Sequence, residues 1–300
     1  MSPRLPPVSR RRFLAGSGAL AGAVLLGACG DDDAGSGSST TESPTGGLSL
    51  VQFFGGLPML VAGSDIRTPF GVGDAEGLLP VDDTPESLAV SILDEAGEEV
   101  VAAVEVARHA EGLPRAYFPL RFRVDTPGIY TGRTEVDGEA LEMAIQIDAA
   151  SDVSVIQPGA AMPAVATPTA TNAEGVDPIC TNDPVCPLHD FSVAQALEDG
   201  RPLALLVSTP AFCQIAICGP VLEVLLGVTG DYPDIGFLHA EVYAHPHEET
   251  DTKAPVIAEL GLTFEPCLVL VGSDGKVVDR LDTIFDADEV SESLGSLASS

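Results

Sequence analysis

The alternation of apolar and polar positions between residues 48 and 150 is typical of β-structure. Short runs rich in β-branched and aromatic residues, several of them alternating, recur at nearly regular intervals. They are LSLVQFF (48–54), SLAVSILD (87–94), EVVAAVEV (99–106), AYFPLRFRV (116–124), GIYTGRTEV (128–136) and LEMAIQID (141–148). Turn signals separate several of them, at 94–97, 126–128 and 137–138. This spacing predicts an all-β sandwich.

The pattern changes between residues 177 and 300, where strand-like and helix-like runs alternate. The expected strands are PLALLVS (202–208), IGFLHAEVYA (235–244), CLVLVG (267–272) and VVDRL (277–281). The expected helices are FSVAQALEDG (191–200), a segment from about 219 to 228, APVIAELG (254–261), and a last helix that places Val290, Leu294 and Leu297 on one face. Because helices and strands alternate and a hairpin with a helix closes the order, we expect an α/β sandwich around a mixed sheet.

Composition separates these two segments from each other and from the N-terminus. Residues 151–176 are dense in Pro, Ala and Thr and predict a linker, whereas residues 29–47 are polar and Gly/Ser-rich and predict a flexible tether. We therefore expect a multidomain chain with a β-sandwich domain at 48–150 and an α/β domain at 177–300. The Thr126-Pro-Gly-x-Tyr130 entry to a late strand resembles immunoglobulin-like or fibronectin-like modules. Because this segment holds no clustered His, Cys or carboxylate residues, we expect it to be a spacer or docking module. We interpret the lone His109 of this segment as a solvated turn residue.

The first 28 residues resemble a Tat export signal closed by a lipoprotein cleavage site. Arg10 and Arg11 form a twin-arginine pair, and an apolar stretch leads to Leu26-Gly-Ala-Cys29. In bacterial- or archaeal-type lipoproteins with this pattern the chain is cut before the cysteine, whose sulfur carries the lipid. The resemblance implies that Cys29 anchors an extracytoplasmic protein to the cell membrane, and an uncleaved N-terminal anchor is the alternative. The other cysteines would then work in an oxidising space.

The negative charge of the chain limits the classes of partner that it can bind. The formal net charge is −31, and cleavage before Cys29 would remove four arginines and no acid, which takes the charge to about −35. Nucleic acid and anionic lipid headgroups are therefore poor partners. High ionic strength would screen the self-repulsion of such a surface, so a salty habitat is compatible with it. The hydrophobic share of 45% is enough for real cores.

Three stretches within residues 189–299 together resemble thioredoxin. ALLVSTPAFC (204–213) matches the family's strand, loop and aromatic residue ahead of the first active-site cysteine, with Phe212 where the family usually has tryptophan. AELGLTFEPCLVLVGSDGK (258–276) matches its helix, turn, cis-proline, strand and hairpin, which makes Pro266 the expected cis-proline. The C-terminal helix is the third match. The resemblance implies a thioredoxin-like α/β fold for this part of the chain.

The cysteine motif departs from the thioredoxin pattern Cys-Gly-Pro-Cys. Four residues separate Cys213 from Cys218, which is followed by Gly219 and Pro220. In one register Cys213 is the first active-site cysteine and Cys218 is a displaced second one. In the other register Cys218 is the first, and Val221 stands where the second would be. The gapless match of the preceding strand favours the first register, because the second needs five extra residues between strand and motif.

Helix geometry limits how this pair can bond. Residues five apart on a continuous α-helix have their Cα atoms roughly 8.6 Å apart, whereas a disulfide rarely spans more than about 7 Å. A Cys213–Cys218 disulfide therefore needs a non-helical loop, and Gly219 as N-cap with Pro220 at the first helical position predicts a helix start just beyond it. The helix N-terminus would favour thiolate. Redox exchange, a permanent structural disulfide and metal binding all remain open for the pair.

A second cysteine pair lies in the turn-rich loop DPICTNDPVCPLHD (177–190). We expect a local structural disulfide between Cys180 and Cys186, with a second exchange pair that passes electrons to Cys213 as the alternative. We interpret His189 as a solvated helix-entry residue and Cys267 as a buried free thiol.

The thioredoxin resemblance implies a thiol–disulfide oxidoreductase. Cys213 would attack a partner disulfide or, when oxidised, accept attack from a partner thiol, and Cys218 would resolve the mixed disulfide. Pro266 would shape the backbone on which a substrate lies, and the negative charge of Glu265 would disfavour acidic partners. The expected partners are exported proteins with thiols or disulfides, or a membrane redox partner. We assign no cofactor, no metal ligands and no nucleic acid.

Two other functions remain open. A thioredoxin scaffold fixed by its disulfide would serve as a non-catalytic binding or structural lipoprotein. In copper-delivery relatives of thioredoxin, two cysteines of this loop act with a distant histidine, and here His239, His245 and His247 lie downstream.

Overall fold

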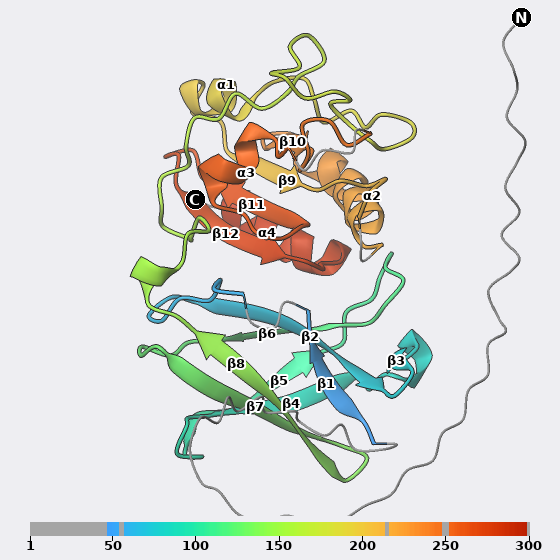
Figure 1. Cartoon of the computed structure of the whole chain (residues 1–300), viewed down its shortest axis with the longest axis vertical. Helices are drawn as coiled ribbons and strands as arrows, with labels where there is room; N and C mark the ends of the chain where they lie inside the picture. The colour runs from blue at the N-terminus through green and yellow to red at the C-terminus, as the bar shows by residue number, and fades with distance from the viewer. Residues whose placement is uncertain (1–46, 54–56, 214–215, 248–251, 299–300) are drawn as a thin grey trace, which may run out of the picture. The chain divides into compact units, whose positions relative to one another are not determined.

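The computed structural model describes residues 47–53, 57–213, 216–247 and 252–298 (Figure 1). Pro44–Ser300 form one compact unit. It contains an N-terminal part made of strands, a connecting segment and a C-terminal part in which helices flank a sheet. The described chain is thus β-rich with few helices.

The N-terminal β part consists of two antiparallel sheets. One sheet contains β1 (Ser49–Gln52), β2 (Ile66–Asp74), β3 (Gly77–Leu78) and β6 (Phe118–Phe122). The other has the order β5-β4-β7-β8, built from β4 (Ser87–Leu93), β5 (Glu99–Ala107), β7 (Gly128–Val136) and β8 (Glu139–Ile147). Along β8 every second residue from Leu141 to Ile147 is buried, as expected for a strand with one face on a core.

Strand β2 is absent from the sequence-based expectations. Its sequence, IRTPFGVGD, carries Pro69 and two glycines, which are depleted in strands. The structure nevertheless places β2 centrally, paired with β1 on one side and β6 on the other. Gly73 is required there, because a Cβ atom at this position would lie 2.6 Å from the carbonyl oxygen of Gly77. Close backbone approach therefore explains the glycine at this position.

The C-terminal α/β part has one four-stranded sheet with the order β10-β9-β11-β12. Its strands are β9 (Leu203–Val207), β10 (Gly236–Ala240), β11 (Cys267–Val271) and β12 (Val277–Asp282). Strands β9 and β10 are parallel, and β11 is antiparallel to both β9 and β12, so the sheet is mixed as expected. The helices are α1 (Val193–Glu198), α2 (Cys218–Val228), α3 (Pro255–Leu260) and α4 (Ala287–Ala298).

The sheet is covered on both faces, which explains the continuous apolar runs of β9 and β11. Leu203, Leu205 and Val207 belong to the same core cluster as the buried residues of α1 and α3. Ala204 and Leu206 belong to the cluster that contains the buried faces of α2 and α4. Successive side chains of β9 thus enter opposite layers.

The connecting segment contains the short 3₁₀ turn η2 (Ala150–Asp152) and otherwise no helix or named strand up to α1. Two further 3₁₀ turns, η1 (Val81–Asp83) and η3 (Thr229–Asp231), lie elsewhere. The segment runs along the α/β part, because the backbone N–H of Met162 donates to Gly275 at 2.9 Å and the N–H of Val277 donates to Ala160 at 2.9 Å. Val155, Met162 and Val165 are buried.

A buried ion-pair network joins the β part to the α/β part. Arg67 of β2 forms a two-pronged ion pair with Glu289 of α4, with N···O distances of 2.6 and 2.7 Å. The hydroxyl of Tyr117 donates to the same carboxylate at 2.7 Å and accepts the backbone N–H of Asp286 at 2.9 Å. His109 Nδ1 lies 2.8 Å from Asp286 Oδ1, so His109 is half-buried and paired rather than a solvated turn residue.

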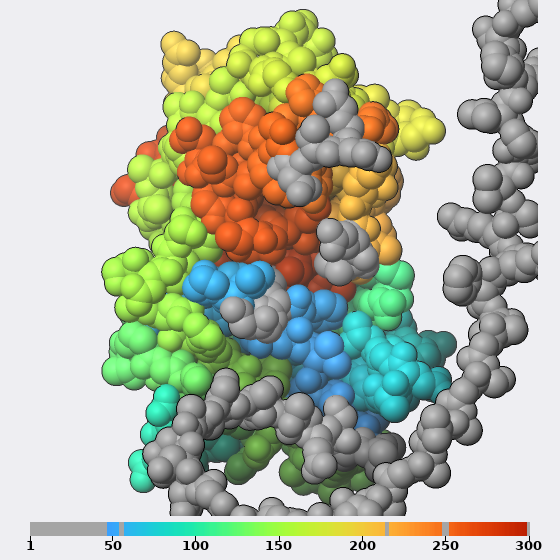
Figure 2. Space-filling view, in the orientation of Figure 1, coloured from blue at the N-terminus to red at the C-terminus, as the bar shows by residue number. Residues whose placement is uncertain are grey.

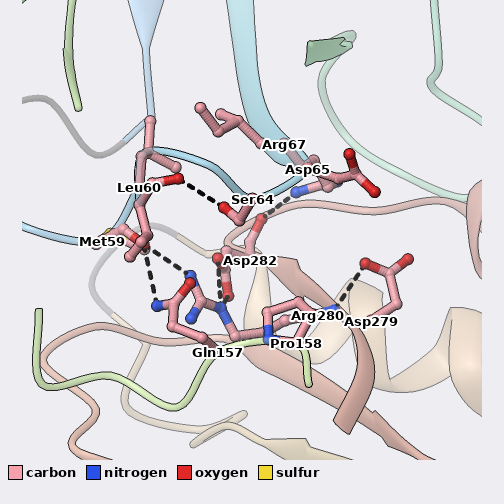
Figure 3. A pocket seen from close by; sticks show the side chains of 12 residues that line it. Met59, Leu60, Ser64, Asp65, Arg67, Gln157, Pro158, Asp279, Arg280 and Asp282 are labelled. Atoms are coloured by element: carbon pink, nitrogen blue, oxygen red, sulfur yellow. Dashed lines mark hydrogen bonds and ion pairs between the residues drawn. The ribbon is translucent and has the colours of Figure 1, made fainter. Parts of the chain in front are cut away.

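A second polar junction lies beside this network (Figure 3). Arg280 pairs with Asp282 at 2.9 Å, and both side chains are about 5% exposed or less. Arg280 also donates to the carbonyl oxygens of Ile156 and Met59, and Gln157 donates to Met59 at 3.3 Å. These contacts line a pocket of only about 20 Å³, too narrow for a substrate.

Candidate active site

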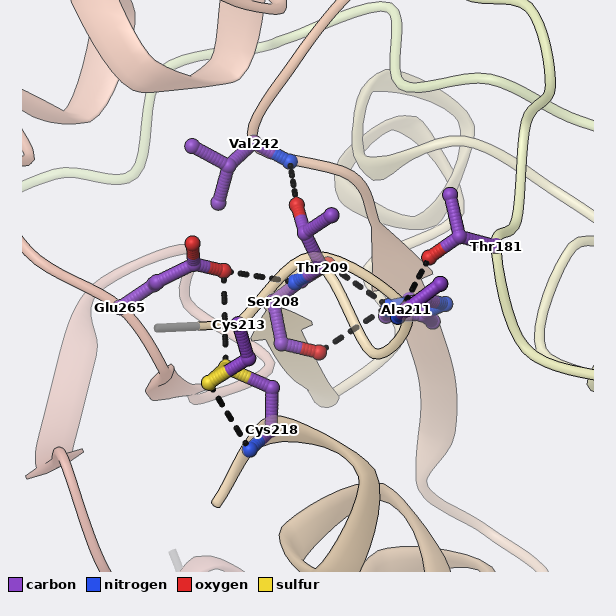
Figure 4. The surroundings of a disulfide bond; sticks show 9 residues. Thr181, Ser208, Thr209, Ala211, Cys213, Cys218, Val242 and Glu265 are labelled. Carbon is purple, nitrogen blue, oxygen red and sulfur yellow. Dashed lines mark hydrogen bonds between the residues drawn. A yellow bond between two sulfur atoms is a disulfide. The ribbon is translucent and has the colours of Figure 1, made fainter. Parts of the chain in front are cut away.

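The site begins where β9 ends. Strand β9 is fully buried, and the loop after it carries Cys213, which is joined by a disulfide to Cys218 (Figure 4). The Cα atoms of the two cysteines are 5.9 Å apart, shorter than a continuous helix would allow, and the described residues between them are not helical. Helix α2 begins at Cys218 itself, slightly earlier than the Gly219 cap that the sequence predicts.

The two sulfurs differ in exposure. Cys213 is partly exposed and lines a pocket, whereas Cys218 is 0% exposed. The backbone N–H of Cys218 donates to Cys213 Sγ at 3.3 Å. In the reduced protein that N–H group, at the positive end of α2, would stabilise a thiolate on Cys213. The geometry therefore favours Cys213 as the sulfur that meets a partner.

Glu265 lies beside the disulfide. Its Oε2 atom accepts the backbone N–H of Thr209 at 2.6 Å and lies 3.6 Å from Cys218 Sγ. Burial raises the pKa of Glu265, and the hydrogen bond from Thr209 opposes that shift. Glu265 is half-buried, and its carboxylate lies against the buried sulfur while the residue also lines the pocket beside Cys213 (Figure 4). The Glu265–Pro266 peptide bond is cis, as the sequence predicts.

A pocket of about 380 Å³ opens beside Cys213. Its wall combines apolar groups, among them Phe53 and Leu57 of the β part, with the polar ends of Lys253 and Glu265. In the space-filling view the blue segment after β1 adjoins the orange segments of the α/β part on this face (Figure 2). The ring of Phe212, the residue before Cys213, is 41% exposed. The pocket thus presents one sulfur to an apolar surface with a few polar groups.

The loop before α1 brings together a second set of residues. Cys180 and Cys186 are buried free thiols, so the disulfide that the sequence predicts is not formed in this structure. Each sulfur instead faces an imidazole: Cys180 Sγ lies 3.6 Å from His239 Nδ1, and Cys186 Sγ lies 3.2 Å from His189 Nε2. His189 is itself buried, contrary to the expected solvated position.

The two thiols shift each other's pKa in opposite directions. A hydrogen bond from the Cys186 thiol lowers the pKa of Cys180, and the two imidazoles lower it further. The same hydrogen bond to Cys180, together with burial, raises the pKa of Cys186. Glu241 lies close by, its Oε1 accepting the backbone N–H of Thr181 at 2.6 Å, and burial raises the pKa of this carboxyl.

Sequence reasoning missed this cluster, although one signal was available. His239 and Glu241 are polar residues in the otherwise apolar run IGFLHAEVYA, and both are buried. The copper-type set of Cys213, Cys218 and a distant histidine is not assembled among the described residues, where the one cluster of possible metal ligands joins His239 to Cys180, Cys186 and His189. His247 lies against Phe212, with 5.2 Å between the ring centroids.

The remaining residues singled out from the sequence are Cys267 and the residues of the N-terminal signal. Cys267 is a fully buried free thiol, as expected, and donates to Asp282 at 3.3 Å, while burial raises its pKa well above the usual value. Arg10, Arg11 and Cys29, the proposed signal and lipidation residues, lie outside the described residues, as does most of the 29–47 tether. Within the described part of the chain, no helix has the length and apolar character that a membrane crossing requires.

Comparison with known proteins does not assign the chain to a family. No family model matches the chain, and no curated protein matches it. Among solved structures, one described as "Structure of MTB dsbF in its mixed oxidized and reduced forms" is similar with 22% sequence identity. The match covers 36% of this chain and 88% of that chain at a TM-score of 0.29, which is too low to establish a shared fold.

Proposed function

We propose that this chain is a thiol–disulfide oxidoreductase of thioredoxin-like type that acts through Cys213 and Cys218. The observation that supports it most is the asymmetry of the disulfide. One sulfur lines a pocket, and the other is buried at the start of α2 against the carboxylate of Glu265. A permanent structural disulfide needs neither an accessible sulfur nor an ionisable group beside it, whereas exchange uses both.

In the reducing direction, the Cys213 thiolate attacks one sulfur of a partner disulfide. A bond forms between Cys213 and that sulfur, and the other partner sulfur leaves as a thiolate. The Cys218 thiolate then attacks Cys213 Sγ, which restores the intramolecular disulfide and releases the second partner thiolate. Two electrons pass from the dithiol to the partner. The oxidising direction is the reverse of these steps, with an exported protein thiol as the electron donor.

Glu265 is proposed to take the proton of Cys218 in the second step. Cys218 is buried, and a buried thiol ionises with difficulty unless a base is close. The Glu265 carboxylate is 3.6 Å from Cys218 Sγ, and its raised pKa brings it nearer to the pH at which proton transfer is efficient. The backbone N–H of Thr209 holds the carboxylate in place at 2.6 Å.

The pocket beside Cys213 suggests what the partner presents. Its volume of about 380 Å³ and its mixed lining fit a short stretch of polypeptide around a cysteine rather than a large cofactor. The net charge of −31 disfavours strongly acidic partners. We therefore propose neutral or basic exported proteins as partners.

The location is also a proposal, and it rests on the N-terminal sequence. We propose that the mature chain starts at Cys29 and is held at the outer side of the cell membrane by a lipid on that residue. Metabolic labelling with a fatty acid tests this: the wild-type chain should incorporate the label, and a Cys29→Ala variant should not. Equal labelling of both would contradict the anchor.

The redox proposal is tested by trapping the mixed disulfide. Full-length protein with Cys218→Ser, incubated with a disulfide-containing client, should accumulate a covalent complex through Cys213, because the resolving sulfur is missing. Cys213→Ser should trap none, and Cys267→Ser should behave like the wild type because that thiol is fully buried and bonded to Asp282. Absence of trapping by Cys218→Ser, with no exchange by the wild type, would leave the disulfide a structural bond.

A further inference from the structure

Four buried side chains with metal-binding atoms converge between the 177–190 loop and β10. They are Cys180, Cys186, His189 and His239, and their ligand atoms all lie within 4.8 Å of one another. Each residue is at most 5% exposed. Of the residues that the structure describes, they form the one such group of three or more His, Cys, Asp or Glu ligands.

The spacing matches a tetrahedral zinc centre. Metal–sulfur and metal–nitrogen bonds of about 2.3 and 2.0–2.1 Å at tetrahedral angles place sulfur and nitrogen ligands roughly 3.5 Å apart. Here Cys186 Sγ lies 3.2 Å from His189 Nε2 and 3.5 Å from His239 Nδ1, and Cys180 Sγ lies 3.6 Å from His239 Nδ1. The donors could thus close around an ion with small movements.

The hydrogen bonds of His239 orient it for this role. Its Nε2 atom lies 3.1 Å from the backbone carbonyl oxygen of Ser208 and 3.1 Å from the hydroxyl of the same residue. The carbonyl oxygen can only accept and the hydroxyl can accept as well, so a proton on Nε2 satisfies both contacts. That tautomer leaves a lone pair on Nδ1, the atom that faces both sulfurs. A ligating histidine in proteins commonly donates its other nitrogen to a carbonyl or carboxylate in this way.

The second histidine is incompletely satisfied. His189 directs Nε2 at Cys186, and its Nδ1 atom is buried with no hydrogen-bond partner in the described structure. Burying two thiols and two imidazoles is costly unless each finds a strong partner. A divalent ion would supply that partner to both sulfurs, to His189 Nε2 and to His239 Nδ1, and two thiolates would neutralise its charge. The Nδ1 atom of His189 would still have no partner among the described residues.

We propose that Cys180, Cys186, His189 and His239 bind one zinc-type divalent ion in a closed tetrahedral site. Four protein ligands leave no open position, so the ion is structural rather than catalytic. It would fasten the 177–190 loop to β10. Thr181 in that loop accepts the backbone N–H of Ala211 at 3.2 Å, two residues before Cys213, so the ion would also support the redox loop (Figure 4).

Cobalt substitution in the full-length protein tests the site without relying on variants. Metal-free protein with free Cys180 and Cys186 should bind one Co²⁺, with a sulfur-to-metal charge-transfer band and the intense visible bands of tetrahedral Co²⁺. Zn²⁺ should displace the cobalt and protect both thiols from alkylation, as read by peptide mass spectrometry. Octahedral-type spectra or absence of stoichiometric binding would overturn the proposal. So would the formation of a Cys180–Cys186 disulfide in reduced protein that has been supplied with Zn²⁺.

Variants inside and outside the four-residue cluster test where the ion binds. Cys186→Ser and His239→Gln should each weaken Co²⁺ binding by about 100-fold or more. Cys267→Ser and His247→Gln, which alter a cysteine and a histidine outside the cluster, should bind as the wild type does. A Cys213→Ser/Cys218→Ser double variant should also keep the metal, which separates this proposal from the redox one. Loss of binding in that double variant, with retention in Cys186→Ser, would place the metal at the other pair and refute the assignment.

Discussion

Replacing Glu265 with Gln tests how the buried sulfur becomes a nucleophile. Glutamine keeps an oxygen for the Thr209 N–H group but cannot take a proton. A thiol with an ordinary pKa of about 8.5 is only about 3% ionised at pH 7. Without a base at 3.6 Å, the Cys218 step should therefore slow by about 30- to 100-fold at pH 7.

The rate of the Cys218 step should also depend on pH in a defined direction. Glu265 acts as a base only when ionised, so the wild-type rate should fall as pH drops through its raised pKa. At a pH high enough for Cys218 to ionise without a base, the difference between wild type and Glu265→Gln should shrink to about twofold.

The assay is the reaction of reduced protein with a limiting aromatic disulfide. Attack by Cys213 releases one coloured thiol, and resolution by Cys218 releases the second, so the second phase reports the step in question. Cys213→Ser gives the blank for the other thiols, and Glu259→Gln, an exposed change on α3, is the matched control. A loss that is equal at all pH values would refute the proton-transfer role. A faster second phase in Glu265→Gln would show that the carboxylate acts mainly by repelling the thiolate.

Two further predictions concern the junction between the β part and the α/β part. Arg67→Met leaves the carboxylate of Glu289 buried without its partner, so we expect the free energy of unfolding in urea to fall by about 3–5 kcal/mol. The control Arg133→Met breaks an exposed ion pair and should lower it by less than about 1 kcal/mol. Equal losses in the two variants would contradict the stabilising role of the buried network. The hydrogen bond to Asp286 raises the pKa of His109, so its contribution is fully present below about pH 6.5 and is lost as pH rises through the raised pKa. The stability gap between wild type and His109→Asn should therefore narrow with rising pH in thermal melts, and a gap that widens would be contrary to this account.

The sequence predicted most of the α/β part because its signals are local. Continuous apolar runs revealed the buried strands β9 and β11, and the spacing of Val290, Leu294 and Leu297 revealed α4. Strand β2 was missed because Pro69 and the glycines argue against a strand, and the close approach of β3 that requires Gly71 and Gly73 is visible only in the structure.

The candidate sites were predicted unevenly. The Cys213–Cys218 pair and cis-Pro266 were identified from sequence motifs. The contacts of Cys180 with His239, 59 residues away, depend on how the 177–190 loop packs on β10, which no local pattern encodes. The contact of Glu265 with the buried sulfur was likewise hidden, because a charged residue beside a turn is usually solvated.

The reduction potential of the Cys213–Cys218 pair tests the central claim most directly. It is measured by thiol alkylation and mass spectrometry of the full-length protein across a series of dithiothreitol ratios, with both cysteines followed by peptide. An exchange-active pair should titrate between about −270 and −120 mV, the range of dithiol carriers. A potential well below about −300 mV, together with no thiol exchange, would contradict the oxidoreductase and mark the bond as structural.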